Sequence, residues 1–288
     1  MCRLFGLSAA PQRVRATFWL LEAPDSLSRQ SHREPDGVGL GTFTAEGAPL
    51  VEKQPIAAYE DRLFAQEARE RESGTFVAHV RFASTGGLNP RNTHPFDQRG
   101  RLFAHNGVIQ GLDELDRELG EYRRLVHGDT DSERFFALIT ARTDHHRGDV
   151  TAGIADAVGW IADRLPLYAL NLVLTTATEL WALRYPETHD LFVLERAAGG
   201  AQGDRHLDHA AATGIRTKSV ALAGYPAVVI ASERMDSDPG WRSLASGELL
   251  HVTGRLDVRS SIIRDSPPCH LLSLYDLDET AAASQTAH

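Results

Sequence analysis

The sequence predicts an α+β fold in which two β-sheets pack face to face and helices cover the outer faces. Predicted strands dominate the first hundred residues, predicted helices follow between residues 112 and 165, and strands return after residue 169. Many of these strands are apolar on both faces, as expected when one face meets a second sheet and the other meets helices. The first strand begins almost at the N-terminus, which usually frays unless a sheet holds it.

Short-range patterns predict the elements in the first half of the chain. Brief alternation over 2–7 predicts a strand, and apolar spacing over 14–22 predicts a helix. A proline and an Asp-Gly pair predict a loop over 31–37. The further elements are strands over 38–43 and 76–82, a helix over 59–71, and a strand over 101–105 that ends at an Asn106-Gly107 turn.

In the second half, helices precede strands. Apolar residues at helical spacing predict helices over 112–122, 129–139 and 150–165. The segment 197–218 is rich in Ala, Gly, Asp and His and is expected to be irregular. Strands are expected over 169–175, 179–184, 190–195, 227–231 and 248–252.

The chain shows no internal repeat and no clear linker. We therefore expect one domain over residues 2–260. A C-terminal extension follows over 261–288, and its last dozen residues are expected to be disordered.

Composition excludes several classes of function. The 288 residues are 42% hydrophobic and 24% charged, as in ordinary globular proteins. The net charge of -9 argues against a nucleic-acid partner. No stretch resembles a signal peptide or a membrane span, so we expect a cytoplasmic protein with no membrane partner. Two cysteines cannot form a disulfide framework or a Cys-rich metal site, and we expect neither a metal nor an organic cofactor.

Cys2 is the first candidate for chemistry. Removal of Met1 would leave a terminal cysteine that carries both a thiol and a free α-amine. The unperturbed pKa of such an amine is about 7.7–8.0, so it can act as the base for its own side chain, as in enzymes with an N-terminal threonine. The alternative is a small apolar residue at the start of an edge strand.

Four other motifs are candidates. Arg81 ends a strand before a glycine-containing loop, where its planar fork suits a carboxylate or a structural ion pair. The Asn106 side chain and the Gly107 N–H could form an oxyanion hole or belong to an ordinary turn. Asp131 lies near a helix start, where it could hold an ammonium or compensate the helix dipole. His94 could assist catalysis or support its loop.

The motifs occur together in the order Met1-Cys2-Arg3, Asp36-Gly37, His79-Val80-Arg81, Asn92-Thr93-His94-Pro95-Phe96, Ala104-His105-Asn106-Gly107 and Asp129-Thr130-Asp131-Ser132-Glu133. In this order and spacing, the sequence resembles the class II glutamine amidotransferases of the N-terminal-nucleophile type. The resemblance covers roughly residues 2–255 and is strongest to the stand-alone branch. That branch includes hydrolases that remove glutamate from a γ-glutamyl intermediate in ergothioneine assembly. The resemblance implies a four-layer αββα sandwich.

The resemblance also implies a role for each motif. Cys2 would attack the amide carbon, while the Asn106 side chain and the Gly107 N–H stabilise the oxyanion. Arg81 would bind the α-carboxylate of the glutamyl group, and Asp131 its α-ammonium. These roles match a substrate head that has one carboxylate, one ammonium and one amide.

The acceptor side of the pocket departs from the family pattern at two positions. Ser84, Thr85 and His94 are expected to line the substrate pocket. Relatives in the stand-alone branch often have tryptophan where this chain has Val38, and synthase-linked members usually have histidine where it has Thr85. Neither change touches the attacking thiol or the oxyanion donors.

Three functions stay open at this point. The first is hydrolysis of glutamine or a γ-glutamyl metabolite through a γ-glutamyl thioester, with release of glutamate. The second is a glutaminase subunit that supplies ammonia to a separate synthase. The third is a non-catalytic protein that binds a glutamyl ligand.

Overall fold

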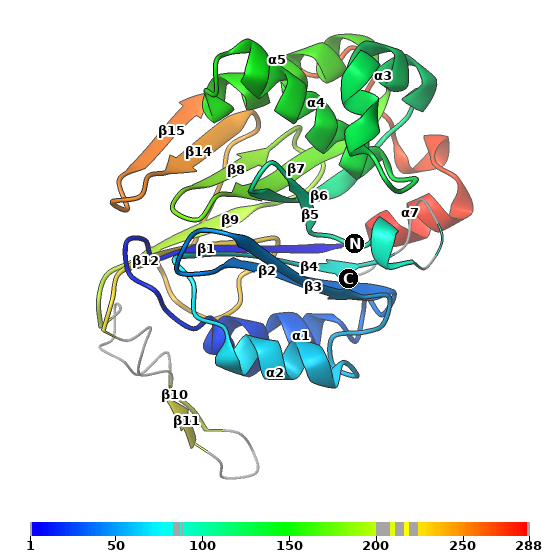
Figure 1. Ribbon diagram of the computed structural model, residues 1–288. Coiled ribbons are helices and arrows are strands. Elements are labelled where there is room, and N and C mark those ends of the chain that lie inside the picture. The colour runs from blue at the N-terminus through cyan, green and yellow to red at the C-terminus, as the bar shows by residue number, and fades with distance from the viewer. Residues whose placement is uncertain are drawn as a thin grey trace.

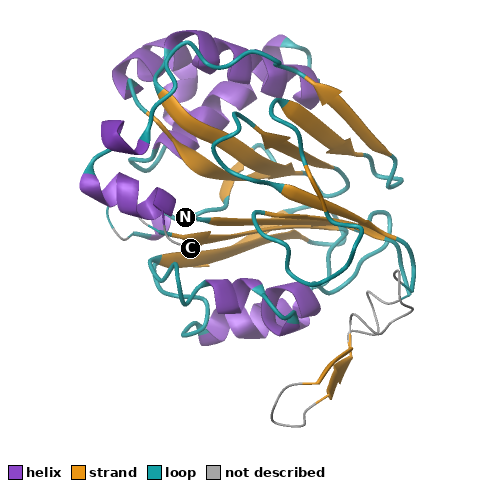
Figure 2. Ribbon diagram, turned by 180° about the vertical axis from the view of Figure 1, so that it is seen from behind, coloured by secondary structure: helices purple, strands orange, loops and turns teal. Residues whose placement is uncertain are grey.

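Two antiparallel sheets stack face to face, and helices cover both outer faces, as the ribbon views show (Figures 1 and 2). The structure is a computed structural model that describes residues 2–82, 87, 89–199, 208–210, 216–218 and 224–286. The layer order is therefore helix, sheet, sheet, helix, and the predicted αββα sandwich is confirmed. Within the described ranges, no helix is long and apolar enough to cross a bilayer.

The first sheet contains the N-terminal strand at its centre. Strand β1 (Arg3–Ser8) pairs with β12 on one side and with β4 on the other. Helices α1 (Leu27–Gln30) and α2 (Arg62–Glu70) cover its outer face, together with a short π-helical turn over Phe18–Glu22. In order across the sheet, the strands are β13 (Arg242–Ser243), β9 (Phe192–Arg196), β12 (Ala227–Ala231), β1, β4 (Thr75–Arg81), β2 (Gly37–Phe43) and β3 (Pro49–Gln54).

The second sheet lies between the first sheet and three helices. These are α3 (Leu112–Leu119), α4 (Asp131–His145) and α5 (Val150–Arg164). Its strands in order are β15 (Val258–Ile262), β14 (Glu248–Val252), β8 (Leu180–Arg184), β7 (Leu167–Thr175), β6 (Arg101–Ile109) and β5 (Phe96–Gln98). The remaining elements are the strand pair β10 (Asp208–Ala210) and β11 (Arg216–Lys218), the 3₁₀ turns Pro90–Asn92, Gly120–Leu125 and Leu274–Asp276, and helix α7 (Glu279–Thr286).

Local capping explains where the main helices begin. Asp61 accepts hydrogen bonds from the backbone N–H groups of the first turn of α2. Thr130 caps α4 and Asp149 caps α5 in the same way, each through one backbone N–H. Such caps satisfy helix-end donors that have no partner within the helix, and each stabilises the fold by about 1 kcal/mol.

Three expectations about elements were wrong. The helix over 14–22 is reduced to its last five residues, because Val14 instead exchanges two backbone hydrogen bonds with Ser73. Asn106-Gly107 is not a turn, because β6 continues through it to Ile109 and pairs it with Asn171 and Leu170 of β7.

The end of the chain is the third difference. Residues 279–286 form α7 rather than a disordered tail, because Leu277 and Ala281 are buried against Val108 and Tyr168. The domain boundary at residue 260 stays a prediction. Most of the segment 197–218, which we expect to be irregular, lies outside the described residues, although β10 and β11 form a two-stranded sheet within it.

Gly39 in β2 permits close packing of the loop that carries His94. A Cβ at Gly39 would lie 1.9 Å from the His94 carbonyl oxygen and 2.9 Å from Cδ of Pro95. The loop that carries the predicted His94 therefore rests directly on the backbone of β2.

Replacing Gly39 with alanine should destabilise the fold, because the new methyl group overlaps backbone atoms that cannot rotate away. We expect the free energy of unfolding to fall by about 1–3 kcal/mol, or by more if the loop cannot shift. Denaturant titration measures this change. The matched control is Gly159→Ala in α5, where a Cβ meets open space and alanine favours the helix. Equal stability of the two variants would contradict the prediction.

Candidate active site

Three strands bring the candidate residues to one end of the space between the sheets. Side chains alternate along a strand, so residues two apart share a face. The faces that form the core between the sheets carry Leu4 of β1, Val77 of β4 and Ala104 of β6. By this alternation, the same faces carry Cys2, Arg81 and Asn106.

The Cys2 side chain is buried, with 8% of its surface exposed. Its Sγ lies 3.4 Å from the Phe82 carbonyl oxygen and accepts a hydrogen bond from the Phe82 N–H at 3.3 Å. Burial raises the pKa of the Cys2 thiol above its ordinary value of 9.0, and the nearby charge of Glu34 raises it further, while the Phe82 contact and Arg81 act in the opposite direction. A base is therefore needed before the thiol can attack near neutral pH.

Asn106 contacts the candidate nucleophile directly. Its Nδ2 donates a hydrogen bond of 2.9 Å to the Cys2 carbonyl oxygen, across the boundary between the two sheets. Its Oδ1 is buried and has no hydrogen-bond partner among the described residues. The side-chain amide is thus held with its donor end toward Cys2.

Gly107 occupies a position where no side chain fits. A Cβ there would lie 1.8 Å from the Ala169 carbonyl oxygen and 2.8 Å from Nε2 of His105. The residue is glycine because β7 passes so close, and not because a turn requires it. The position next to Asn106 can therefore contribute only its backbone.

Arg81 and Asp131 are buried residues of opposite charge, at the end of β4 and at the start of α4. Arg81 is 4% exposed and donates to the Gly87 carbonyl at 3.3 Å. Burial lowers the pKa of its guanidinium, whereas the charges of Cys2, Asp36 and Asp131 raise it. The Asp131 carboxylate accepts the Ile109 N–H at 2.8 Å and the Ser132 N–H at 2.9 Å. Asp131 therefore ties the start of α4 to the end of β6.

His94 has the surroundings of a supporting residue. Its ring lies 4.2 Å from that of His79 and 4.7 Å from that of Phe96, measured between centroids. Neither of its ring nitrogens has a hydrogen-bond partner among the described residues, and burial holds its pKa well below the ordinary value. Ser84 and Thr85, the other expected pocket residues, lie outside the described part of the chain.

Sequence reasoning missed a buried ion-pair network beside Cys2. Arg3 contacts Glu233 at 2.6 Å and Glu34 at 3.5 Å, and the side chains of Arg3 and Glu34 are at most 1% exposed. Burial raises the pKa of Glu34 to about 7, although Arg3 and Arg33 lower it. Only the charged Arg3 at the start of the first strand signalled this network, because its partners lie 31 and 230 residues further along the chain.

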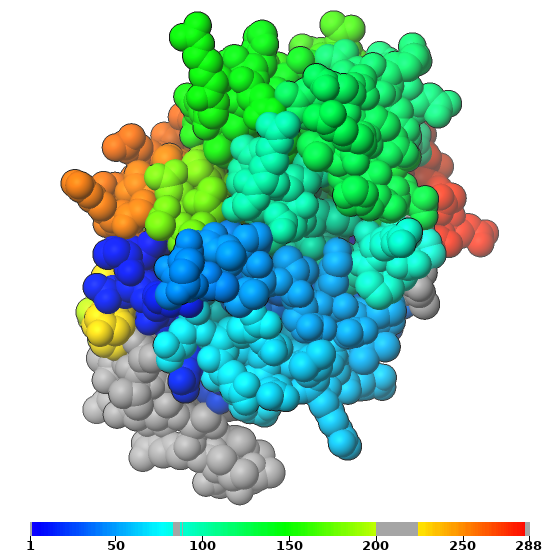
Figure 3. All heavy atoms as spheres, in the orientation of Figure 1, coloured from blue at the N-terminus to red at the C-terminus, as the bar shows by residue number. Residues whose placement is uncertain are grey.

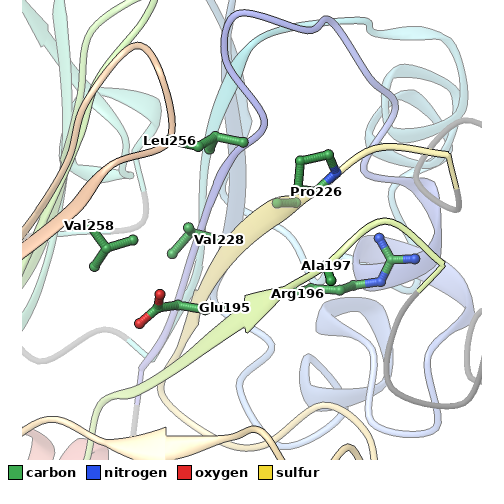
Figure 4. Close-up of a pocket in the computed structure, with 8 residues that line it drawn as sticks. Glu195, Arg196, Ala197, Pro226, Val228, Leu256 and Val258 are labelled. Atoms are coloured by element: carbon green, nitrogen blue, oxygen red, sulfur yellow. The ribbon is translucent and has the colours of Figure 1, made fainter.

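A cavity at the other end of the sandwich does not include these residues. It has a volume of about 190 Å³ and is lined by Glu195, Val228, Leu256 and Val258 among others (Figure 4). Val228 pairs with Ser8, at the opposite end of β1 from Cys2. At about 3.3 Å per residue, six residues separate the two places by about 20 Å.

Comparison with known proteins settles the family. A family model described as class-II glutamine amidotransferases matches residues 1–269. The chain belongs to this family. The geometry above is consistent with it, since a buried N-terminal cysteine contacts an Asn-Gly pair. The chain is accordingly an amidohydrolase of the class II glutamine amidotransferase type, and the predicted resemblance is confirmed.

Several curated proteins are similar over part or most of their length. An uncharacterized protein of Methanocaldococcus jannaschii is 29% identical over 87% of this chain and 68% of its own length. DUG3 of Saccharomyces cerevisiae, named as a glutamine amidotransferase, is 31% identical over 50% of this chain and 46% of its own length. YafJ of Escherichia coli, similarly named, is 26% identical over 86% of this chain and 96% of its own length.

Solved structures with the same fold have lower identity. The glutamine phosphoribosylpyrophosphate amidotransferase of B. subtilis matches with a TM-score of 0.63 at 20% identity, over 92% of this chain and 50% of that one. A class-II domain protein of Silicibacter pomeroyi matches with a TM-score of 0.58 at 18% identity, over 93% of this chain and 100% of that one. These matches establish the N-terminal-nucleophile hydrolase fold.

The buried His79 should make stability depend on pH. Burial lowers its pKa to about 3, helped by the charge of Arg81, so the folded protein keeps this ring neutral where the unfolded chain protonates it. Stability is thus fully present above pH 6.5 and decreases as pH falls from 6.5 toward 3, by at most about 1.4 kcal/mol per pH unit. Denaturant titrations at pH 7, 6 and 5 measure the slope. His79→Asn should lower the slope without abolishing it, because the buried His94 and His189 contribute to it in the same direction. His270→Asn, at an exposed position, should leave the slope unchanged. Equal slopes for the two variants would disprove this account.

Proposed function

We propose that this chain hydrolyses the γ-amide of glutamine or of a γ-glutamyl metabolite through a thioester on Cys2. One observation supports this above all: Asn106 donates to Cys2 across the two sheets, on the same face and at the same end as Arg81. Nucleophile, oxyanion donor and carboxylate ligand then meet at one place. The family establishes glutamine amide hydrolysis as the general reaction, and the specific steps below are our inference.

The first step is formation of the nucleophile. Removal of Met1 frees the α-amine of Cys2, which takes the thiol proton through a water molecule. This base offsets the burial that raises the pKa of the thiol. The thiolate then attacks the δ-carbon of the substrate, and a tetrahedral oxyanion forms.

The oxyanion is stabilised by two donors. An amide nitrogen carries two hydrogens, so Asn106 Nδ2 can hold the Cys2 carbonyl with one and the oxyanion with the other. The Gly107 N–H supplies the second donor. As the intermediate collapses, the C–N bond breaks, the leaving amine takes the proton held by the α-amine, and a γ-glutamyl thioester remains on Cys2. Water then cleaves the thioester and releases glutamate.

The head of the substrate is held by charge. The buried Arg81 guanidinium binds the α-carboxylate, and the Asp131 carboxylate binds the α-ammonium, while Ser84 and Thr85 complete the pocket and His94 supports it. A charged pair in buried surroundings discriminates well, because a substrate that lacks either group forms one fewer charge-assisted hydrogen bond in the site.

The greater length of some relatives suggests a second function. The chain spans only 50% of the B. subtilis phosphoribosylpyrophosphate amidotransferase and 46% of DUG3. A glutaminase domain within a longer protein can pass ammonia to another site, and this chain could supply a separate synthase in the same way. Glutaminase activity that rises when a partner binds would favour this version. Binding of a glutamyl ligand without any turnover would favour a non-catalytic role.

Substitution of the oxyanion donor should separate binding from chemistry. Asn106→Ala removes the oxyanion donor and also the hydrogen bond that holds the Cys2 carbonyl, so we expect kcat to fall by at least about 10²–10³-fold. Cys2→Ala should abolish turnover. Glutamate release from glutamine and from a panel of γ-glutamyl amides measures both effects, after intact mass has confirmed that Met1 is absent.

The matched control is Cys269→Ala, which removes the exposed thiol and should leave kcat unchanged. Activity retained by Cys2→Ala would rule out Cys2 as the nucleophile. Equal loss in Cys269→Ala would show that the loss is not specific to Cys2.

A further inference from the structure

The C-terminal segment 271–286 lies beyond the residues that match the family and packs against the strand that carries Asn106. Leu167 at the start of β7 donates to the His270 carbonyl at 3.0 Å and accepts from the Leu272 N–H at 2.9 Å. Further along, Leu277 and Ala281 pack against Val108, two residues after Asn106 on β6. At about 3.3 Å per residue, this contact is only about 7 Å along the strand from Asn106.

Both ribbon views place α7 next to the N-terminal end of β1 (Figures 1 and 2). In the space-filling view, the C-terminal segment in red and the segment after β4 in cyan appear along the same side of the molecule (Figure 3). The C-terminal segment is thus a neighbour of the site in space, although it is the part of the chain farthest from Cys2 in sequence.

A chain of contacts connects α7 to the nucleophile. Oε1 of Gln285 lies 2.6 Å from Nε2 of His189. The His189 carbonyl accepts a hydrogen bond of 3.2 Å from Asn171 Nδ2, and Asn171 is the register partner of Asn106. Asn106 in turn holds the Cys2 carbonyl. All five residues are buried, so the helix is docked on the structure that supports the oxyanion donor.

The strand order puts this contact on one particular flank of Cys2. Arg81 ends β4, which pairs with β1 on one side. His189 leads into β9, which lies beyond β12 on the other side. A glutamyl group has its head on one side of the δ-carbon and the leaving amine on the other. A glutamyl group that has its head on Arg81 and extends across β1 has its leaving amine on the flank that His189 and α7 occupy.

We propose that the C-terminal segment is the wall of the leaving-group side and restricts the substrate to ammonia or a small uncharged amine as leaving group. This inference rests on the proposed hydrolysis at Cys2. It assigns substrate selection to α7 and to the Gln285–His189 contact, which act by closing this flank and not by touching the reacting atoms.

The chemistry of the wall agrees with an uncharged leaving group. Val108, Tyr168, Leu277 and Ala281 form its apolar part. Burial and the charge of Arg3 lower the pKa of His189, to about 4, so its ring is neutral at pH 7 while Gln285 acts in the opposite direction. A charged leaving group would lose its hydration here without gaining a counter-ion, because the four apolar side chains, the neutral His189 ring and Gln285 carry no charge.

The test compares two amides that share the glutamyl head and differ in the leaving amine. Glutamine and a γ-glutamyl anilide are hydrolysed by the full-length chain, and kcat/KM is measured for each from released glutamate. Ala281→Glu places a charge in the apolar contact and should undock α7, and Gln285→Ala removes the His189 contact. The control Ala283→Glu makes the same change on the exposed side of the same helix.

We expect the ratio of kcat/KM for the anilide over glutamine to rise by about tenfold in Ala281→Glu and to a smaller extent in Gln285→Ala. The ratio should not change in Ala283→Glu. Hydrogen exchange over 277–286 reports whether α7 has undocked, and if Ala281→Glu fails to fold, Gln285→Ala decides.

An unchanged ratio in a variant whose α7 exchanges freely would overturn the proposal, as would equal rises in Ala281→Glu and Ala283→Glu. Failure of the proposed function looks different. The wild-type chain, with Met1 removed, would then hydrolyse neither amide.

Discussion

The hydrogen bond from Asn106 to the Cys2 carbonyl is the contact on which the site depends, because it joins the two sheets at the end where the chain begins. The chain end would fray without such a tie. The bond requires β1 and β6 to approach closely. Next to Asn106 on β6, Gly107 lets β7 pass, since a Cβ there would lie 1.8 Å from the Ala169 carbonyl oxygen. The position of Cys2, the orientation of the Asn106 amide and the packing of the two sheets therefore depend on one another.

Local patterns predicted much of the fold because local interactions decide those parts. Helices α4 and α5 begin where Thr130 and Asp149 cap them. The Asn106-Gly107 dipeptide misled for the opposite reason. It is a turn signal over four residues, but the pairing with Asn171, 65 residues away in sequence, overrides that preference. The alanine-rich end of the chain likewise has little local preference, and contacts with distant residues such as Val108 and His189 order it.

The candidate site was predictable as a set of residue types but not as an electrostatic environment. The sequence indicated Cys2, Arg81, Asn106 and Asp131 through their order, and the structure brings the first three to one face. The Arg3–Glu34–Glu233 network could not be anticipated, since its members meet only when β1 is inserted between β4 and β12. Because this network is buried beside the Cys2 thiol, the pKa values of Glu34 and Cys2 depend on how the whole chain folds.

The central claim is covalent attack by Cys2, and mass spectrometry of the protein during turnover tests it most directly. Full-length chain with Met1 removed is mixed with excess glutamine, quenched in acid within milliseconds to seconds, and digested. The account predicts a γ-glutamyl group on the N-terminal peptide that contains Cys2, at a level that rises and then decays as glutamine is consumed. Turnover with no adduct on Cys2 at any time, in a chain whose Cys2→Ala variant is still active, would contradict it.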